Sequence, residues 1–359
     1  MRQAGLLLAK PSSLLYQPML WNQALLLFLA FCFNLKGTSL EKLSLAPNST
    51  ALPRGCYVFL HVGLGPSREQ EANGDGLLVD DGERFHLRED IWIERLDEST
   101  STNIQRACEP PHYDLDKVIR DRQLYAFVMQ IPSPQRTRYD GLQILRSVIS
   151  LSRLVKPTST GDRYCAQVMH FGLRDSQVLS IEFRGVSLDV TLGPNSRDWL
   201  TRRDGEELRR LMPWASEDKK MHERVHRAYW NHEYAMRSNT VDIRWMFVVE
   251  GLDALINTGR AKCEYQFRIR VKKLADYLRI FSTPITPEEL TKAYKIRSKL
   301  VHTEKFLYGL DEILPCIEHN ALYEKLEAVL RITVRTALLD ETFGNSFETE
   351  ASVASRWNV

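Results

Sequence analysis

The chain lacks the short motifs that bind nucleotide phosphates or present a serine nucleophile. Its 359 residues contain no G-x-x-x-x-G-K-[ST] loop, no G-x-G-x-x-G loop and no G-x-S-x-G elbow. The two glycine-rich loops hold phosphates with backbone amides, and the elbow exposes a catalytic serine. Their absence disfavours nucleoside triphosphate hydrolysis and α/β-hydrolase chemistry.

An excess of charge and clustered cysteines are also lacking. Lys and Arg number 48 against 46 Asp and Glu, a net charge of +2, so any nucleic-acid site must be a local patch. The six cysteines contain no C-x-x-C pair, which favours free thiols in a reducing compartment over a disulfide framework. They are Cys32, Cys56, Cys108, Cys165, Cys263 and Cys316.

Long hydrophobic runs are absent except for one near the N-terminus. The run from Ala24 to Leu35 is too short for an ordinary membrane span, so no membrane partner is expected. Its length resembles the apolar part of a signal peptide, but few charged residues precede it and no clean cleavage site follows it. We favour a buried N-terminal helix and a cytoplasmic protein, and a signal peptide at 24–35 stays the alternative.

Composition divides the chain into four regions and predicts an α+β fold, with no internal repeat. An apolar leader and a poorly ordered segment occupy residues 1–50, and a mixed, β-rich domain follows at 51–200. A helical domain is expected at 205–340 and a polar, frayed tail at 341–359. The sequence alone does not say what the N-terminal domain recognises.

The β-rich domain contains short runs of branched and aromatic residues, which are typical of strands. Strands are expected at Cys56–Leu64, Ile91–Leu96, Leu124–Ile131, Tyr164–Leu173 and Val178–Leu192, with one helix at Gly141–Val155.

From Arg202 onward, helical periodicity with few turn signals predicts an antiparallel bundle with short loops. Its helices are expected at Gly205–Arg237 with a break at Pro213, Asn239–Ile256 with Asn239 as N-cap, Tyr265–Phe281, Thr286–Thr303 and Ala321–Leu339.

The helix expected from Thr286 to Thr303 carries the main candidate site. Thr286 and Glu289 have the spacing of a capping box, and Pro287 suits the first helical position. Arg297 and His302 lie further along, five positions apart, which places their side chains about 140° apart around the axis. Such a pair arises easily by chance, and its ordinary interpretation is a solvated arginine with a helix-terminal histidine.

Three sequence blocks around this pair give it context. They are R-W-M-F-V-V-E-G-L-D-A-L-I-N-T-G (Arg244–Gly259), E-Y-Q-F-R-I-R-V-K-K-L-A (Glu264–Ala275) and Y-K-I-R-S-K-L-V-H (Tyr294–His302). In this order they resemble the Apea-like branch of the HEPN domains, with its (F/A)-x-x-L-E-A-L-L, Y-x-L-A-x-R-x-A and Y-x-x-R-S-x-x-V-H helices. Asp253 stands where Glu is usual and Thr303 where Gly is common, and nothing comparable covers residues 1–200.

The resemblance implies an all-α antiparallel HEPN-type bundle that forms a homodimer and brings two Arg–His pairs to a shared cleft. Many such domains are endoribonucleases that need no metal or other cofactor. Arg297 would hold the scissile phosphate, His302 would act as general acid or base, and Ser298 would support them. Related proteins suggest a defence or stress effector whose N-terminal region senses an unknown trigger. The alternative is a non-catalytic HEPN bundle used for dimerisation or docking.

Two weaker candidates lie in the first helical segment. His222, Glu223 and His226 form an H-E-x-x-H string, which on a helix would offer two zinc ligands and a base, with Glu250 as a further ligand. Flanking lysines and arginines disfavour a cation site there, so a polar helix face is the preferred interpretation. The aromatic and basic stretch Arg224–Arg237 would suit stacking on single-stranded RNA, but an amphipathic helix with a partly buried Tyr229 and Trp230 is preferred.

Overall fold

A computed structural model describes residues 63–64, 83–95, 124–129, 138–157, 164–169, 177–183, 200–216, 219–238, 240–259, 262–302, 307–310 and 312–357. The apolar run at 24–35, most of the strand expected at 56–64 and the expected N-cap Asn239 lie outside these stretches. None of the helices within them has the length and apolar character that crossing a bilayer requires.

A small antiparallel sheet comes first along the described chain. Its strands are β1 (Gly63–Leu64), β2 (Arg84–Arg88), β3 (Ile91–Arg95) and β4 (Leu124–Met129), in the spatial order β1-β4-β3-β2. Ile93 of β3 lies opposite Phe127 of β4, and both side chains are fully buried. The strands expected at 91–96 and 124–131 are thus confirmed as β3 and β4. Two further strands, β5 (Tyr164–Met169) and β6 (Gln177–Phe183), pair with each other and overlap two further expected segments.

Strand β2 is not expected from the sequence. Its R-F-H-L-R pattern alternates exposed and buried side chains, with Phe85 and Leu87 inside. Helix α6 (Arg202–Ala215) packs against this strand. Arg209 of α6 donates a hydrogen bond from Nε to the carbonyl oxygen of His86 at 2.8 Å, and its guanidinium lies 4.5 Å from the centre of the Phe85 ring. The polar half of β2 therefore faces solvent, and its apolar half joins the core.

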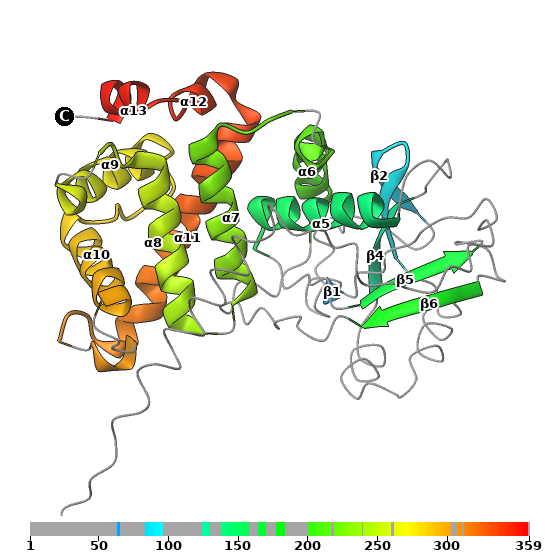
Figure 1. The fold of residues 1–359 in the computed structure, drawn as a ribbon, viewed down its shortest axis with the longest axis horizontal. Helices are drawn as coiled ribbons and strands as arrows, with labels where there is room; N and C mark the ends of the chain where they lie inside the picture. The colour runs from blue at the N-terminus through cyan, green and yellow to red at the C-terminus, as the bar shows by residue number, and fades with distance from the viewer. Residues whose placement is uncertain are drawn as a thin grey trace, which may run out of the picture. The chain divides into compact units, whose positions relative to one another are not determined.

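The rest of the described chain is mostly helical, which confirms the predicted α+β class and the helical bundle. Besides α6, its helices are α5 (Arg138–Val155), α7 (Glu223–Arg237), α8 (Val241–Ile256), α9 (Cys263–Tyr277), α10 (Pro287–His302), α11 (Cys316–Leu339), α12 (Glu341–Asn345) and α13 (Glu350–Trp357). Helices α7, α8 and α11 run side by side, and α9 and α10 pack beside α8 (Figure 1). Residues Pro53–Val359 form one compact unit. The domain boundary expected between residues 200 and 205 therefore stays a prediction.

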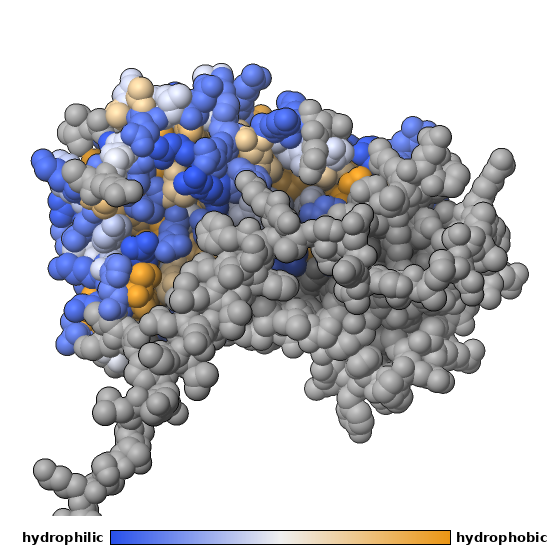
Figure 2. All heavy atoms as spheres, in the orientation of Figure 1, coloured by the Kyte–Doolittle hydropathy of each residue, from blue (hydrophilic) through white to orange (hydrophobic). Residues whose placement is uncertain are grey.

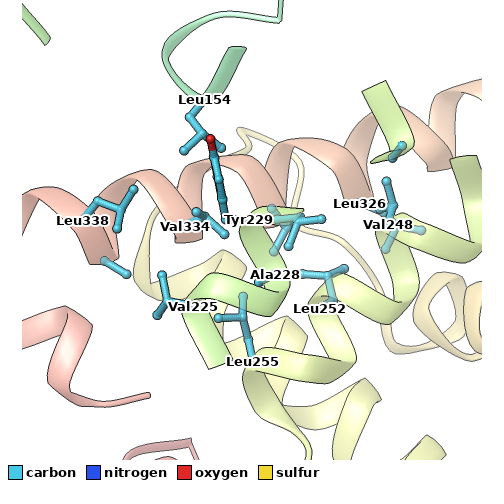
Figure 3. Close-up of a cluster of buried hydrophobic side chains, with 14 of the residues drawn as sticks. Leu154, Val225, Ala228, Tyr229, Val248, Leu252, Leu255, Leu326, Val334 and Leu338 are labelled. Carbon is cyan, nitrogen blue, oxygen red and sulfur yellow. The ribbon is translucent and has the colours of Figure 1, made fainter. Parts of the chain in front are cut away.

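The core of the helical region lies between α7, α8 and α11 (Figure 3). Leu154 of α5 points into the same cluster of buried side chains. Gly251 of α8 lies at a close approach to α11, because a Cβ atom there would come within 2.7 Å of Leu330 Cδ2. The other labelled core residues are Val225, Ala228 and Tyr229 of α7, Val248, Leu252 and Leu255 of α8, and Leu326, Val334 and Leu338 of α11.

The C-terminal segment corrects one expectation, since residues 341–357 form helices instead of a frayed tail. Phe343 of α12 stacks on Tyr277 of α9 with ring centres 5.7 Å apart, and Phe347 stacks on Trp357 at 5.9 Å. The side chains of Phe343, Phe347 and Trp357 are almost fully buried. Arg356 places its guanidinium 5.2 Å from the Tyr277 ring centre. Aromatic contacts with α9 therefore order a segment whose composition is largely polar.

A buried ion cluster joins α5 to α7. Arg153 of α5 pairs with Glu233 of α7, and each side chain is only 1% exposed. Arg237, one turn further along α7, donates Nε to Glu233 Oε1 at 2.6 Å. The carboxylate of Glu233 therefore pairs with a buried guanidinium across the contact between α5 and α7.

A second buried carboxylate, Glu327, joins α7 to α11. Its Oε1 lies 2.9 Å from His232 Nε2 and accepts a hydrogen bond from Arg331 Nε, also at 2.9 Å. His232 and Glu327 are both buried. The cluster therefore fixes the register of α7 against α11 with charged groups inside an otherwise apolar interface.

The free energy of unfolding is expected to fall in acid because of these two carboxylates. Burial alone would raise the pKa of Glu233 and of Glu327, but neighbouring arginines, together with His232 in the case of Glu327, outweigh it and hold each pKa below the ordinary 4.5. The unfolded chain then binds more protons in the acid range. The stabilisation is complete above the unfolded pKa and is lost as the pH falls through the folded pKa. Urea unfolding across this range tests the expectation, and an unchanged free energy at about pH 3 would contradict it.

Candidate functional site

Helix α10 begins with the capping box that the sequence predicts. The backbone N–H of Glu289 donates to Thr286 Oγ1 at 3.1 Å, and the N–H of Thr286 donates to Glu289 Oε2 at 2.8 Å. Glu289 also accepts a hydrogen bond from Lys325 of α11 at 2.6 Å. Burial would raise the pKa of Glu289, but Lys325 and the Thr286 amide lower it below its ordinary value. The start of the site-bearing helix is therefore fixed both locally and against α11.

The structure places Arg297 and His302 in different environments. Leu290, Ala293 and Ile296 anchor α10 in the core, so residues on the other faces of the helix carry the site. Arg297 is half-buried, with 22% of its side chain exposed, whereas His302 is exposed at the last residue of the helix. Five residues of α-helix separate the two by about 140° around the axis. A single chain therefore presents them on different sides of α10.

Arg297 is held by Glu250 of α8. Its Nη2 donates to Glu250 Oε1 at 3.0 Å, and the Glu250 side chain is 35% exposed. Arg297 Nε is buried and has no hydrogen-bond partner among the described residues. The ion pair therefore ties α10 to α8 at the level of the candidate site.

Asp253 and Tyr294 complete the polar surroundings of Arg297. Burial raises the pKa of Asp253, and the charge of Glu250 acts in the same direction, while Asn257 and Arg297 oppose it. Burial also raises the pKa of Tyr294, and Asp253 adds to this effect. Arg297 thus lies in the electrostatic field of the Glu250 and Asp253 carboxyl groups on α8. Its positive charge is largely compensated within one chain.

The C-terminal half of α8, which carries both acidic residues, is anchored by two arginines. Arg224 of α7 donates Nη1 to the carbonyl oxygens of Ala254 at 3.2 Å and Asn257 at 2.6 Å. Arg270 of α9 donates Nη1 to the carbonyl oxygen of Ile256 at 2.5 Å. Burial and the charge of Arg224 lower the pKa of Arg270. Cations at the carbonyl end of a helix satisfy its last acceptors and its dipole.

Exposed lysines share a face of α10 with His302. Lys295 and His302 are seven positions apart, so they lie within about 20° of each other around the axis, and Lys299 lies between them along the helix. All three are exposed. Ser298 is half-buried and lies about 40° from His302. Figure 2 shows the surface over α9 and α10 as largely hydrophilic, with a few small hydrophobic spots.

The H-E-x-x-H string does not assemble as a ligand set. His222 precedes the first residue of α7, and its Nε2 lies 3.1 Å from Asn345 Oδ1. Glu223 pairs with Arg227, and His226 Nε2 accepts a hydrogen bond from Trp230 Nε1 at 2.8 Å. Within the described stretches, no three His, Cys, Asp or Glu side chains gather in a metal-binding arrangement.

The aromatic and basic stretch of α7 packs several of its rings against one another and against α8. Tyr229 is buried, whereas Trp230 is half-buried with its ring centre 5.9 Å from that of Tyr234. The Tyr234 ring lies 5.4 Å from that of Phe247 on α8. The preferred interpretation, an amphipathic helix with partly buried aromatics, agrees with this arrangement.

Cysteine placement is described for one thiol. Cys263 forms no disulfide with another described residue and is half-buried at the first residue of α9, beside Tyr294. The side chains of the other five cysteines lie outside the described residues, so the expectation of free thiols stays a prediction.

Sequence reasoning located Arg297, Ser298 and His302 but not the residues that surround them. It assigned Glu250 only to a zinc hypothesis and noted Asp253 only as a departure from a motif. The available signal was their E-x-x-D spacing, which puts two carboxylates on one face of α8. Lys295 and Lys299 were also missed, although their spacing to His302 is visible in the sequence.

The fold and site define an α+β protein whose helical bundle presents an arginine, a histidine and exposed lysines along one helix. No protein-family model, no curated protein and no solved structure matches the chain.

Proposed function

We propose that this protein is a metal-independent endoribonuclease of the HEPN type that cleaves RNA through Arg297 and His302. The observation that carries the proposal is the arrangement along α10. An exposed histidine ends the helix beside exposed Lys295 and Lys299, and a positioned arginine lies just over one turn before it. Exposed cations attract the phosphate backbone, and a histidine can exchange protons near neutral pH.

The chemistry needs no cofactor because RNA supplies its own nucleophile. One histidine acting as a base removes the proton of the 2′-OH, which attacks the adjacent phosphorus and expels the 5′-oxygen of the next nucleotide. The leaving oxygen takes up a proton, and the product ends in a 2′,3′-cyclic phosphate. Arg297 would stabilise the charge that develops on the phosphate oxygens. Ser298 would donate a hydrogen bond to the phosphate or orient His302.

The proposal requires two copies of the chain. Arg297 and His302 of one copy face different directions, so a cleft at a dimer interface would bring the pairs of both copies to one RNA strand. Val301, which lies between them on α10, is 38% exposed, and Val241 at the start of α8 is 44% exposed. Leu307 donates its backbone N–H to Asp242 Oδ1 at 2.6 Å, so the region just beyond α10 lies near the start of α8. Exposed apolar side chains near a polar site favour a homodimer there.

The rival function is a non-catalytic bundle for dimerisation or docking. The Glu250–Arg297 ion pair favours it, since the pair compensates the arginine charge that a phosphate would need. In either case we place the protein in the cytoplasm, with residues 51–200 sensing an unknown trigger. A role in defence or stress would follow from this layout.

Cleavage of labelled single-stranded RNA in the presence of EDTA tests the proposal. Wild-type protein is expected to produce fragments with cyclic phosphate ends, and Arg297→Ala is expected to reduce the rate by about 100-fold, the cost of losing one charge-stabilising donor. Arg227→Ala is the matched control, because this exposed arginine of α7 also pairs with a glutamate.

Equal cleavage by wild type and Arg297→Ala would locate the activity elsewhere and overturn the assignment. Absence of cleavage by the wild type, together with equal growth of cells expressing wild type or the variant, would favour the docking function.

A further inference from the structure

The donors of Arg297 are not equally available to a ligand. Nε is buried without a partner, and Nη2 donates to Glu250. No residue in the described stretches accepts a hydrogen bond from Nη1. Since 22% of the side chain is exposed while Nε is buried, the exposed edge of the guanidinium is its Nη end. A phosphate would therefore be bound by Nη1 and the second N–H of Nη2.

Glu250 determines where that edge lies. Its carboxylate makes an ion pair with Arg297 alone among the described residues, and the α8 segment beyond it is held by Arg224 and Arg270. Arg297 has a long side chain with several rotatable bonds, so ordering it on binding would lose conformational entropy and weaken the affinity. An acceptor on a well-anchored helix orders the side chain before the ligand binds, so less entropy is lost on binding.

We propose that Glu250 is the positioning residue of the phosphate site, which holds the guanidinium of Arg297 with its Nη1 edge toward RNA. This inference rests on the proposed function, because it takes RNA phosphate as the ligand. The role belongs to the hydrogen-bond acceptor Oε1, so a glutamine can perform it. The negative charge of Glu250 weakens phosphate binding. A substitution that removes the charge but keeps the hydrogen-bond acceptor should therefore strengthen binding.

A purely structural ion pair would behave differently. Both side chains are partly exposed, at 22% and 35%, so losing the pair should cost much less stability than losing a fully buried pair. Removing Glu250 should therefore leave the fold intact, so that a change in RNA binding reports on the position of Arg297. The pair Glu207–Arg335 is a matched control, since it also joins two helices, at 3.2 Å, with side chains 26% and 22% exposed.

The test measures binding of a fluorescent single-stranded 2′-O-methyl RNA, which lacks the nucleophile and cannot be cleaved. Glu250→Ala is expected to weaken binding roughly tenfold, as loss of one charge-assisted contact would. Glu250→Gln is expected to bind as well as wild type or several-fold more tightly at low salt, a gain that shrinks as salt screens the charge. Adding Glu250→Ala to Arg297→Ala should weaken binding no further, because both act through one contact. Glu207→Ala and Glu207→Gln should bind like wild type.

Wild-type binding by Glu250→Ala, or an equal loss in Glu250→Gln and Glu250→Ala, would overturn the inference. Failure of the wild type to bind this RNA would contradict both the inference and the proposed function. Binding that follows the expected series without cleavage of natural RNA would support Glu250 as the positioning residue and reject the nuclease.

Discussion

Replacing Glu233 with alanine is expected to lower the free energy of unfolding by about 3–5 kcal/mol. The substitution removes the carboxylate that pairs with Arg153, whose side chain is 1% exposed. The guanidinium charge then stays inside the protein without this counter-ion, because a buried group does not recover its hydration and arginine does not shed its proton. Arg237 loses the same acceptor but is about one-third exposed and can turn toward water. Chemical denaturation followed by circular dichroism measures the change.

Glu223→Ala provides a matched control on the same helix. Glu223 also pairs with an arginine four residues further along, but its side chain is 76% exposed, so its loss should cost less than about 1 kcal/mol. A double variant, Arg153→Met with Glu233→Leu, should recover most of the stability, because an apolar pair removes both buried charges together. Equal effects of Glu233→Ala and Glu223→Ala would contradict the prediction, because they would show that the protein interior tolerates the Arg153 charge without the Glu233 carboxylate.

The start of α10 shows what sequence reasoning predicts well. The capping box involves two residues three positions apart, and its hydrogen bonds are local, so Thr286 and Glu289 suffice to predict it. The buried stripe of α10 follows from helical spacing in the same way. Local chemistry fixes such elements before any tertiary contact forms.

Strand β2 and the C-terminal helices show where local reasoning fails. The R-F-H-L-R segment has two apolar residues, and only pairing with β3 and cover from α6 make it a strand. Residues 341–357 look polar, but Phe343 and Trp357 find a partner in Tyr277 of α9. In both cases a residue far away in the sequence decides the outcome, and one sequence does not reveal that pairing.

The candidate site also has one part that local sequence predicts and one part that depends on tertiary packing. The spacing of Arg297 and His302 and their motif are local and were found. Their relation to Glu250 depends on how α8 packs against α10, over a separation of 47 residues. The same packing shows that the charge of Arg297 is compensated within one chain, which the motif does not indicate.

Replacing His302 with alanine is expected to reduce RNA cleavage by about 10²–10⁴-fold, the usual contribution of a general acid or base. His302 is exposed at the end of α10, so its loss removes no buried contact and the fold should persist. Binding of 2′-O-methyl RNA should change little, because the phosphate is held mainly by Arg297 and the neighbouring lysines. A fall in rate without a matching fall in binding would therefore identify a chemical role. Single-turnover cleavage with saturating protein makes the measurement.

His226→Ala is the matched control for this experiment, since His226 is also an exposed histidine on a bundle helix. It accepts a hydrogen bond from Trp230 and lies on α7, whereas the Arg297 contact joins α10 to α8. Equal loss of cleavage in both variants would point to a general effect of removing histidines from the bundle. Full activity of His302→Ala would end the Arg–His mechanism, because no other group that the proposal places beside Arg297 exchanges protons near neutral pH. The cleaving groups would then lie elsewhere in the protein, and the exposed lysines of α10 would remain only as a binding surface.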